Sequence, residues 1–107
     1  MLIYKILLPS EWAEFDASGT FTGSPFDHES GFIHLSSADQ VAATASRIFG
    51  DAPELIVVAI DDASVADALR WEDSDNHGRF PHLYGSLSRD DVDEVRTVAG
   101  AAAVTAF

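Results

Sequence analysis

The sequence contains no cysteine among its 107 residues, which excludes disulfide bonds and thiolate-bound metals. The absence fits a reducing compartment, and we expect a cytoplasmic protein. No apolar run approaches the roughly 20 residues that a membrane-spanning helix needs, so we expect a soluble protein with no membrane partner. The N-terminal stretch MLIYKILLPSEW has neither a basic leader nor a small-residue cleavage site. It is therefore interpreted as a first strand rather than a signal peptide.

Basic residues are also scarce. The chain has six lysines and arginines against 18 aspartates and glutamates, a formal net charge of −12. The basic residues are dispersed: Lys5, Arg47, Arg70, Arg79, Arg89 and Arg96. Proteins bind nucleic acids largely through clustered lysine and arginine, so no nucleic-acid partner is expected. The acidic excess is interpreted as a solvated surface that keeps the protein soluble.

The hydrophobic pattern predicts one small domain over residues 1–99, followed by a C-terminal tail over residues 100–107. Strands are expected over residues 2–8, 54–61 and 95–98, and a hairpin is expected to turn at residues 76–78. Short helices are expected after the caps Ser10, Ser37 and Asp62, with a helical turn after Ser88. Residues 17–30 are predicted to form a loop. These elements predict a mostly antiparallel α+β fold.

Two histidines lie in nearly the same local sequence. GFIHLSS (31–37) and RFPHLYG (79–85) both contain Phe-x-His-Leu, centred on His34 and His82. In an extended strand Phe32, His34 and Ser36 point to one side. Pro81 indicates that the second strand lies at an edge or is irregular. Each histidine is alternatively a structural one bonded to a carbonyl or a hydroxyl, but the repeated frame leads us to ask whether both face one pocket.

The segments IYKILLPSEW, SGFIHLSSADQ, LRWEDS and RFPHLYGSL, in this order and at these intervals, resemble a widespread uncharacterised bacterial family, domain of unknown function 952. The resemblance covers nearly the whole chain, and the block GFIHLS with FPHLYG is specific. It implies no activity, because none is established for that family.

A more distant resemblance concerns the NAD-dependent RNA 2′-phosphotransferases. The order of a Leu-Tyr-type strand, a helix with tryptophan, a glycine loop, a strand ending in His-Leu-Ser and an apolar strand ending in aspartate is similar to their catalytic half. This resemblance implies the ADP-ribosyltransferase fold, with split antiparallel sheets that clasp NAD. It matches His34 to a histidine of that family's His-x-His-Leu-Ser strand and Asp61 to its strand-closing acid. Lys5 and Phe32 stand where that family has histidines.

Cleavage of the nicotinamide–ribose bond develops positive charge on the ribose, so the site needs aromatic walls, hydrogen-bond donors and a nearby carboxylate. The catalytic residues proposed from the sequence are His34, Glu72 and His82. The residues expected to bind NAD or another small nucleotide are Tyr4, Lys5, Ser36, Ser37, Trp71 and Tyr84. Trp71 and Tyr84 are alternatively packing residues of the hairpin, and Glu72 a solvated acid of its turn.

Other kinds of site are less favoured by the sequence. A metal site could combine His34, His82 and His28 with Asp27 or Glu29, but the chain lacks His-x-His and Glu-x-x-His spacing, so no metal is expected. Serine hydrolysis is not favoured either, because the sequence contains no Gly-x-Ser-x-Gly nucleophile elbow. Besides an NAD-dependent transferase, two hypotheses remain: a small-ligand-binding module without turnover, and a structural or dimerising domain with no active site.

Overall fold

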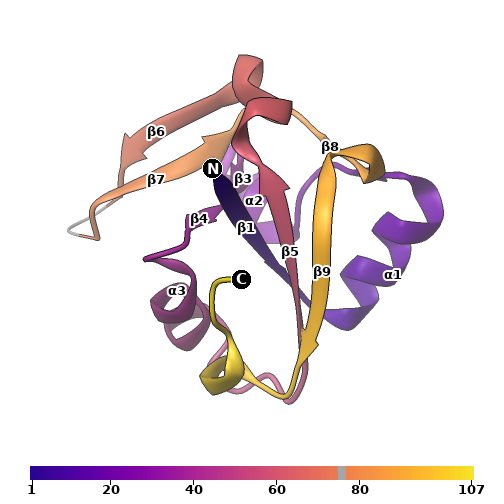
Figure 1. The fold of residues 1–107 in the computed structure, drawn as a ribbon, viewed down its shortest axis with the longest axis vertical. Helices are drawn as coiled ribbons and strands as arrows, with labels where there is room; N and C mark the ends of the chain where they lie inside the picture. The colour runs from indigo at the N-terminus through magenta and orange to yellow at the C-terminus, as the bar shows by residue number, and fades with distance from the viewer. Residues whose placement is uncertain (75–76) are drawn as a thin grey trace.

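The computed structural model describes residues 1–74 and 77–107 and forms an α+β domain in which the paired strands are antiparallel (Figure 1). A four-stranded sheet has the order β4 (Ser36–Ser37), β1 (Leu2–Leu7), β5 (Leu55–Asp61) and β9 (Val92–Val98). A three-stranded sheet has the order β3 (Ile33–His34), β7 (Arg79–Leu83) and β6 (Leu69–Asp73). A small pair joins β2 (Thr20–Phe21) to β8 (Leu87–Ser88). The predicted α+β class is confirmed.

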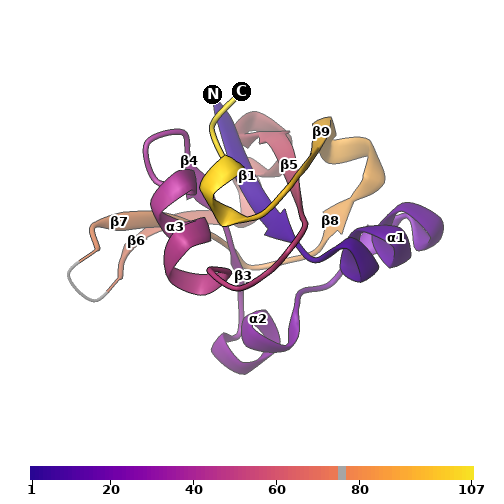
Figure 2. The same cartoon turned by 90° about the horizontal axis from the view of Figure 1, so that it is seen from below.

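Short helices connect and cover the sheets. The α-helices are α1 (Pro9–Ser18), α2 (Pro25–Ser30) and α3 (Val41–Ile48). Three 3₁₀ segments come later in the chain: η1 (Asp62–Ala68), η2 (Arg89–Asp91) and η3 (Ala101–Ala103). Seen from below, α3 and α1 lie on opposite sides of the molecule, with α2 beneath them near β3 (Figure 2). Among the described residues, no helix is long and apolar enough to cross a membrane.

The central strands of the four-stranded sheet, β1 and β5, are buried on both faces. Alternate residues of β5 face opposite sides, so Ile56, Val58 and Ile60 pack into one hydrophobic cluster, and Val57 and Ala59 pack into the other. This confirms the interpretation of residues 54–61 as a strand buried on both faces. Strand β1 divides in the same way, which places Lys5 on the side of the first cluster, where a lone ammonium requires a partner.

The start of the chain's first helix differs from the prediction. Helix α1 begins at Pro9, its N-cap is Leu8, and Ser10 is an exposed residue of the first turn. Proline favours the first helical position because its missing N–H would have no partner there. The Glu11 side chain accepts a hydrogen bond from the Leu8 amide (2.8 Å), so the reciprocal half of a capping box forms without a serine.

Residues 17–30 are not the unstructured loop that their composition predicts. They contain the end of α1, strand β2 and helix α2. Ser24 caps α2 by accepting a hydrogen bond from the Asp27 amide (3.2 Å), and Pro25 occupies the first turn. Gly31 ends the helix at φ 87°, in the left-handed region that glycine tolerates best. A six-residue helix therefore lies within a stretch rich in turn residues.

The predicted strand over the first histidine motif is split between two sheets. Ile33 and His34 pair with β7, whereas Ser36 and Ser37 pair with β1. Between them, the Leu35 amide donates to the Pro81 carbonyl (3.1 Å). Proline cannot return the second bond of this pair, because it has no N–H. The ladder between β3 and β7 therefore ends at Pro81, and the chain crosses to the other sheet.

Strand β7 is the central strand of its sheet, so the prediction that Pro81 marks an edge or irregular strand rather than a central one is wrong about the position of the strand. In an extended strand, the amide and carbonyl of one residue point to the same side. The carbonyl of Pro81 faces Leu35, so its missing N–H lies on that side and leaves the ladder with β6 intact. The hairpin itself is confirmed, with β6 pairing along β7 from Leu69 to Asp73. Of the predicted turn residues, Asn76 lies outside the described residues.

The C-terminal region contains more structure than the sequence indicates. Ser88 caps the turn η2 as predicted, but strand β9 begins at Val92, where a helical turn was expected. Residues 100–107, expected to be a tail, include η3 and the buried side chains of Ala101 and Val104. They pack into the second hydrophobic cluster, against α3 and the Tyr4 face of β1.

Candidate functional site

His34 and His82 are direct cross-strand partners in the three-stranded sheet. Opposed residues of an antiparallel pair point to the same face, and the two ring centroids are 5.7 Å apart. Both side chains line one cavity of about 560 Å³ where the four-stranded and three-stranded sheets meet. This volume is within the range of small-molecule and cofactor sites. The repeated Phe-x-His-Leu frame therefore brings both histidines to one cavity.

The cavity wall combines apolar and aromatic side chains with a few polar groups. Strand β1, helix α3 and the start of α2 contribute most of it, and β7 closes one side. Three exposed apolar residues form its rim: Leu8 (39% exposed), Phe26 (53%) and Ile48 (48%). The polar and ionisable side chains in the wall are Tyr4, Lys5, Glu11, Ser24, Asp27, His34, Ser36, Thr44, Arg47, Ser74, His77 and His82.

The buried carboxylate of Asp27 connects this wall to both neighbouring strands. Its Oδ2 accepts from Lys5 Nζ (2.8 Å) and the Ser24 amide (2.9 Å). Its Oδ1 accepts from the amide of His34 (3.1 Å) and from His34 Nδ1 (2.6 Å). Lys5 Nζ also donates to the His34 carbonyl (3.0 Å). Four donors occupy the acceptor sites of one carboxylate, so Asp27 is fully used in holding α2, β1 and β3 together.

These contacts set the protonation of the cluster. Burial raises the pKa of the Asp27 carboxyl, but the hydrogen bond from the His34 ring, the Lys5 charge and the remaining hydrogen bonds outweigh it and hold that pKa far below its usual range. Burial lowers the pKa of Lys5, and the Asp27 charge opposes this shift. Because ionised Asp27 can only accept, His34 Nδ1 carries a hydrogen and Nε2 is the acceptor of the neutral ring.

His82 is held in a similar way by a second carboxylate. Its Nδ1 is 2.9 Å from Glu72 Oε1, and the Tyr84 hydroxyl donates to the same oxygen (2.6 Å). The Tyr84 hydrogen bond, followed by that of His82, lowers the pKa of Glu72, and the reciprocal bond raises the pKa of Tyr84. Across the part of the chain that the structure describes, Nε2 of His34 and of His82 forms no hydrogen bond with protein. Each ring can therefore offer Nε2 to a ligand.

Aromatic rings fix the two imidazoles from their faces. Phe26 stacks on His34 with centroids 4.3 Å apart, and Phe32 stacks on His82 with centroids 4.0 Å apart. Phe32 also contacts His34 (4.6 Å) and Tyr84 (5.3 Å). Imidazole orientation is thus set both by carboxylates at Nδ1 and by rings at the faces, as preorganised acid–base groups require.

The structure brings together five of the residues named from the sequence. Lining the cavity are Tyr4, Lys5, His34, Ser36 and His82. Lys5 is expected from the sequence to pair with a ligand phosphate, and in the structure its charge is matched by Asp27. The Tyr4 hydroxyl is hydrogen-bonded to the main chain of Phe107, and Ser36 Oγ donates to Thr44 Oγ1 (3.1 Å).

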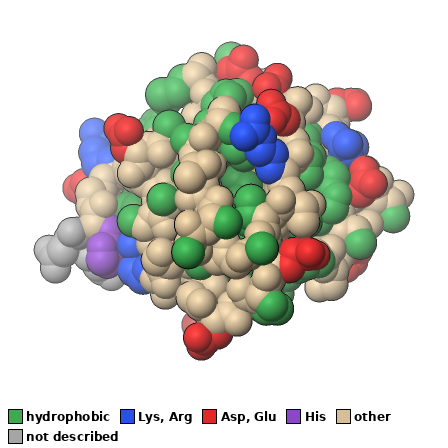
Figure 3. All heavy atoms as spheres, turned by 60° about the horizontal axis from the view of Figure 1, so that its bottom comes forward, with side chains coloured by type: hydrophobic (Ala, Val, Ile, Leu, Met, Phe, Trp, Pro, Cys, Tyr) green, Lys and Arg blue, Asp and Glu red, His purple; other side chains and the backbone are tan. Residues whose placement is uncertain are grey.

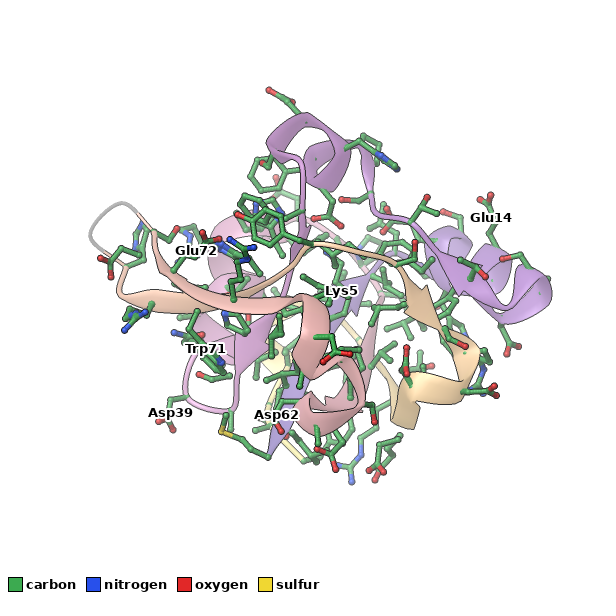
Figure 4. All side chains as sticks on the ribbon, turned by 90° about the horizontal axis from the view of Figure 1, so that it is seen from above. Lys5, Glu14, Asp39, Asp62, Trp71 and Glu72 are labelled. Carbon is green, nitrogen blue, oxygen red and sulfur yellow. The ribbon has the colours of Figure 1, made fainter. Side chains whose placement is uncertain are left out.

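Glu72 and Tyr84 lie outside the described cavity wall and support it through His82. Trp71 is on the opposite face of β6 from Glu72 (Figure 4), where it packs against the first hydrophobic cluster rather than offering a ring to a ligand. Ser37 pairs with Ile3 and donates its amide to Gln40 Oε1 (3.0 Å), away from the cavity wall. Asp61 is at the exposed end of β5, where it accepts from the Ala63 amide (3.1 Å).

Sequence reasoning missed two residues that shape the site: Asp27 and Arg47. Asp27 was considered only as a metal ligand. The signal that could have found it is Ser24-Pro25-x-Asp27, a capping box with aspartate in place of glutamate. Arg47 follows Thr44 by three residues on α3, so both side chains share the helix face that lines the cavity.

No group of three or more His, Asp or Glu side chains arranged to hold a metal ion occurs within residues 1–74 and 77–107. Of the metal set weighed from the sequence, Asp27 binds Lys5 and His34, and His28 is exposed on α2.

Comparisons with known proteins agree with this architecture. A crystal structure of CC0527 from Caulobacter crescentus is 40% identical, covers 91% of this chain and 85% of that chain, and gives a TM-score of 0.83. A double mutant of CC0527 gives the same values. The solution NMR structure of CC0527 is 41% identical, covers 89% and 82%, and gives a TM-score of 0.77.

No curated protein matches the chain. These relatives share the α+β fold, and the likeness to ADP-ribosyltransferases stays a prediction. A family model described as "Protein of unknown function (DUF952)" matches residues 6–95, which is most of the chain. The chain therefore belongs to the DUF952 family.

Proposed function

We propose that the protein binds NAD in the cavity between its two larger sheets and cleaves the nicotinamide–ribose bond, transferring the ADP-ribosyl group to an oxygen nucleophile. The observation that carries this proposal is the pairing of His34 and His82, each held at Nδ1 by a carboxylate, on the wall of one cavity of about 560 Å³. Two oriented imidazoles in a largely apolar cavity are suited to proton transfer on a bound ligand.

In the proposed reaction, the bond between ribose C1′ and the nicotinamide nitrogen breaks, and neutral nicotinamide leaves with the electron pair. The nucleophile is water in the simplest case, and its oxygen forms the new bond to C1′. Nε2 of His34 accepts the proton that the water loses. His34 is assigned this role because its side chain is 28% exposed, whereas that of His82 is 7% exposed. His82 instead holds a ribose hydroxyl through Nε2.

Positive charge develops on the ribose as nicotinamide departs. Asp27 and Glu72 favour this charge indirectly, because each carboxylate accepts from Nδ1 and makes the opposite nitrogen a stronger acceptor. Glu72 is therefore a positioning residue in this proposal, in place of the direct role expected from the sequence. Aromatic rings at the rim, above all Phe26, offer the flat surface that nicotinamide needs.

The test is to incubate the pure protein with NAD and to follow nicotinamide and ADP-ribose by chromatography, while measuring NAD affinity by calorimetry. His34→Asn is the sharpest variant, because the asparagine amide can still donate to Asp27 but lacks Nε2. We expect nicotinamide release to fall by about a hundredfold or more with little change in NAD affinity. His28→Ala is the matched control, since His28 is exposed on α2 and does not line the described cavity.

A wild-type protein that neither binds NAD nor releases nicotinamide would contradict the proposal. Equal rates in His34→Asn and wild type would remove His34 from the chemistry.

A second candidate is a binding module without turnover. It is favoured by the apolar rim of Leu8, Phe26 and Ile48, which can hold a ligand without any reaction. The same experiment separates the two: a binding module gives a calorimetric signal with NAD and no nicotinamide above the background of the buffer.

A further inference from the structure

Arg47 is the cavity's cation without a carboxylate partner among the described residues. The other cation of the wall, Lys5, is neutralised by Asp27 at 2.8 Å. Elsewhere in the described chain, two of the four remaining arginines form ion pairs: Arg89 with Asp16 and Arg96 with Glu94. Arg70 lies over the Tyr84 ring, and Arg79 donates to the Trp71 carbonyl. In a chain with 18 acidic residues, a guanidinium on a cavity wall that has no carboxylate partner among the described residues is available to bind an anion from outside the protein.

The position of Arg47 suits a ligand that enters from solvent. The residue is exposed in the last turn of α3, and its guanidinium carbon is 5.9 Å from the centroid of the Phe80 ring. This cation–π contact holds the guanidinium beside the cavity while its N–H groups stay available. Thr44 and Ile48 lie on the same face of the helix and also line the cavity.

The charges of the wall favour one anionic group rather than many. Lys5 and Asp27 cancel, which leaves Arg47 and the carboxylate of Glu11. Glu11 belongs to α1, on the other side of the molecule from α3 in Figure 2, and its Oε1 accepts from the Leu8 amide. Figure 3 shows one face of the molecule, on which the acidic side chains are dispersed, most of them toward its edge. The anionic part of a ligand is therefore directed to the α3 side, and its apolar or aromatic part to the Phe26 side.

We propose that Arg47 is the anion-binding residue of this cavity, and that it makes the site select aromatic ligands that carry a phosphate over the same ligands without one. This inference deepens the proposed function and rests on it only for the choice of nicotinamide compounds as probes. Arginine suits the task because its fork of donors binds two phosphate oxygens at once, which a lysine cannot reproduce.

The test compares two probes that differ by one phosphate, nicotinamide mononucleotide and nicotinamide riboside, by calorimetry at fixed ionic strength. Wild-type protein is expected to bind the mononucleotide at least about tenfold more tightly. Arg47→Gln removes this preference by weakening the mononucleotide alone, and Arg47→Lys restores part of it. Arg89→Gln is the control, because it changes the net charge equally at a residue that lies outside the described cavity wall. Because Arg47 is exposed, both of its substitutions should leave the melting temperature nearly unchanged.

AMP and adenosine, run in the same way, separate this inference from the proposed function. If nicotinamide compounds do not bind, but AMP binds more tightly than adenosine and Arg47→Gln abolishes the difference, the NAD chemistry fails and the anion site stands. If NAD is cleaved while Arg47→Gln keeps the full preference for phosphate, the proposed function stands and the anion site is overturned. The inference is also overturned if no phosphate-bearing probe binds better than its counterpart.

Discussion

At the scale of single residues, the carboxylate of Asp27 joins groups that the chain brings from three places. Lys5 comes from β1, Ser24 from the start of α2, and His34 from β3. Such a buried pair contributes modestly to stability as a whole, because desolvation offsets much of the attraction. Removing one partner is different, since it leaves the other charge buried and unpaired.

Asp27→Asn should therefore lower the free energy of unfolding at pH 7 by about 3 kcal/mol or more. The asparagine can still accept a hydrogen bond from the Ser24 amide but cannot neutralise Lys5, whose side chain is 7% exposed. Urea titration followed by circular dichroism measures the effect. Asp39→Asn is the control, because Asp39 is exposed and the same chemical change there should cost less than about 0.5 kcal/mol.

The stability difference between wild type and Asp27→Asn should also depend on pH. Asp27 has a folded-state pKa below its unfolded value, which is about 3.9 for an aspartate. Its contribution to stability is therefore present at neutral pH and is lost as the pH falls through about 5 towards the folded-state pKa. The stability difference between wild type and Asp27→Asn should shrink over that acid range. A difference that stays constant from pH 7 to pH 3 would contradict the assigned ion pair.

At the scale of secondary-structure elements, the two short N-terminal helices begin differently. Helix α2 has a serine cap that accepts a backbone hydrogen bond, whereas the N-cap of α1 is Leu8 and makes no such side-chain bond. The sequence suggested the reverse, since it assigned a cap to Ser10 and no helix to residues 25–30.

Replacing each serine by alanine should distinguish these helix starts. Ser24→Ala removes an acceptor of the Asp27 amide and should cost about 1 kcal/mol of unfolding free energy. Ser10→Ala affects an exposed first-turn residue and should stay within about 0.5 kcal/mol. Thermal melts at one pH compare them directly. A larger loss in Ser10→Ala than in Ser24→Ala would contradict the observed start of α1.

Strands that a short stretch of sequence specifies by its own pattern were predicted well. The apolar run of β5, the alternation around His34 and the turn chemistry of the hairpin gave strands close to the observed ones. The prediction from Pro81 was wrong because a proline is excluded from a central strand only where the ladder needs its N–H. Here the missing N–H of Pro81 is on the side of Leu35, where the ladder with β3 ends.

The composition of the candidate site was only partly predictable. The repeated Phe-x-His-Leu frame identified His34 and His82, because the same local sequence predicts the same strand face. The partnership of Asp27 with Lys5 was not predictable in this way, since 22 residues separate them and only the fold of α2 brings them together. The choice between a ligand role and hairpin packing for Trp71 was not predictable either, because alternation alone does not say which face of β6 meets the core.

At the scale of the whole molecule, the residues after the matched family segment complete one of the two hydrophobic clusters. Val104 is 2% exposed, and the Phe107 ring packs edge-on against Tyr4 with centroids 5.4 Å apart. The guanidinium carbon of Arg96 lies over the Phe107 ring, 4.2 Å from its centroid. Because Tyr4 also lines the cavity, the C-terminal residues support the cavity wall from behind.

Val104→Ala should lower the free energy of unfolding by about 2 kcal/mol, because it removes two buried methyl groups from a filled cluster. Thr105→Ala, at the exposed neighbouring residue, should change it by less than about 0.5 kcal/mol. Chemical denaturation of both variants measures the difference. If the two substitutions cost the same, the last residues do not pack as part of the core.

The split strand that contains His34 and Ser36 belongs to two ladders at once, with His34 opposite His82 and Ser36 opposite Tyr4. A slip of one residue in either ladder would turn every side chain of that strand to the other face. Because only Leu35 separates the two pairings, neither ladder can slip unless the other slips with it. The facing of the two histidines is thus specified twice, so an insertion or deletion between residues 33 and 37 would separate them even where every contacting residue is kept.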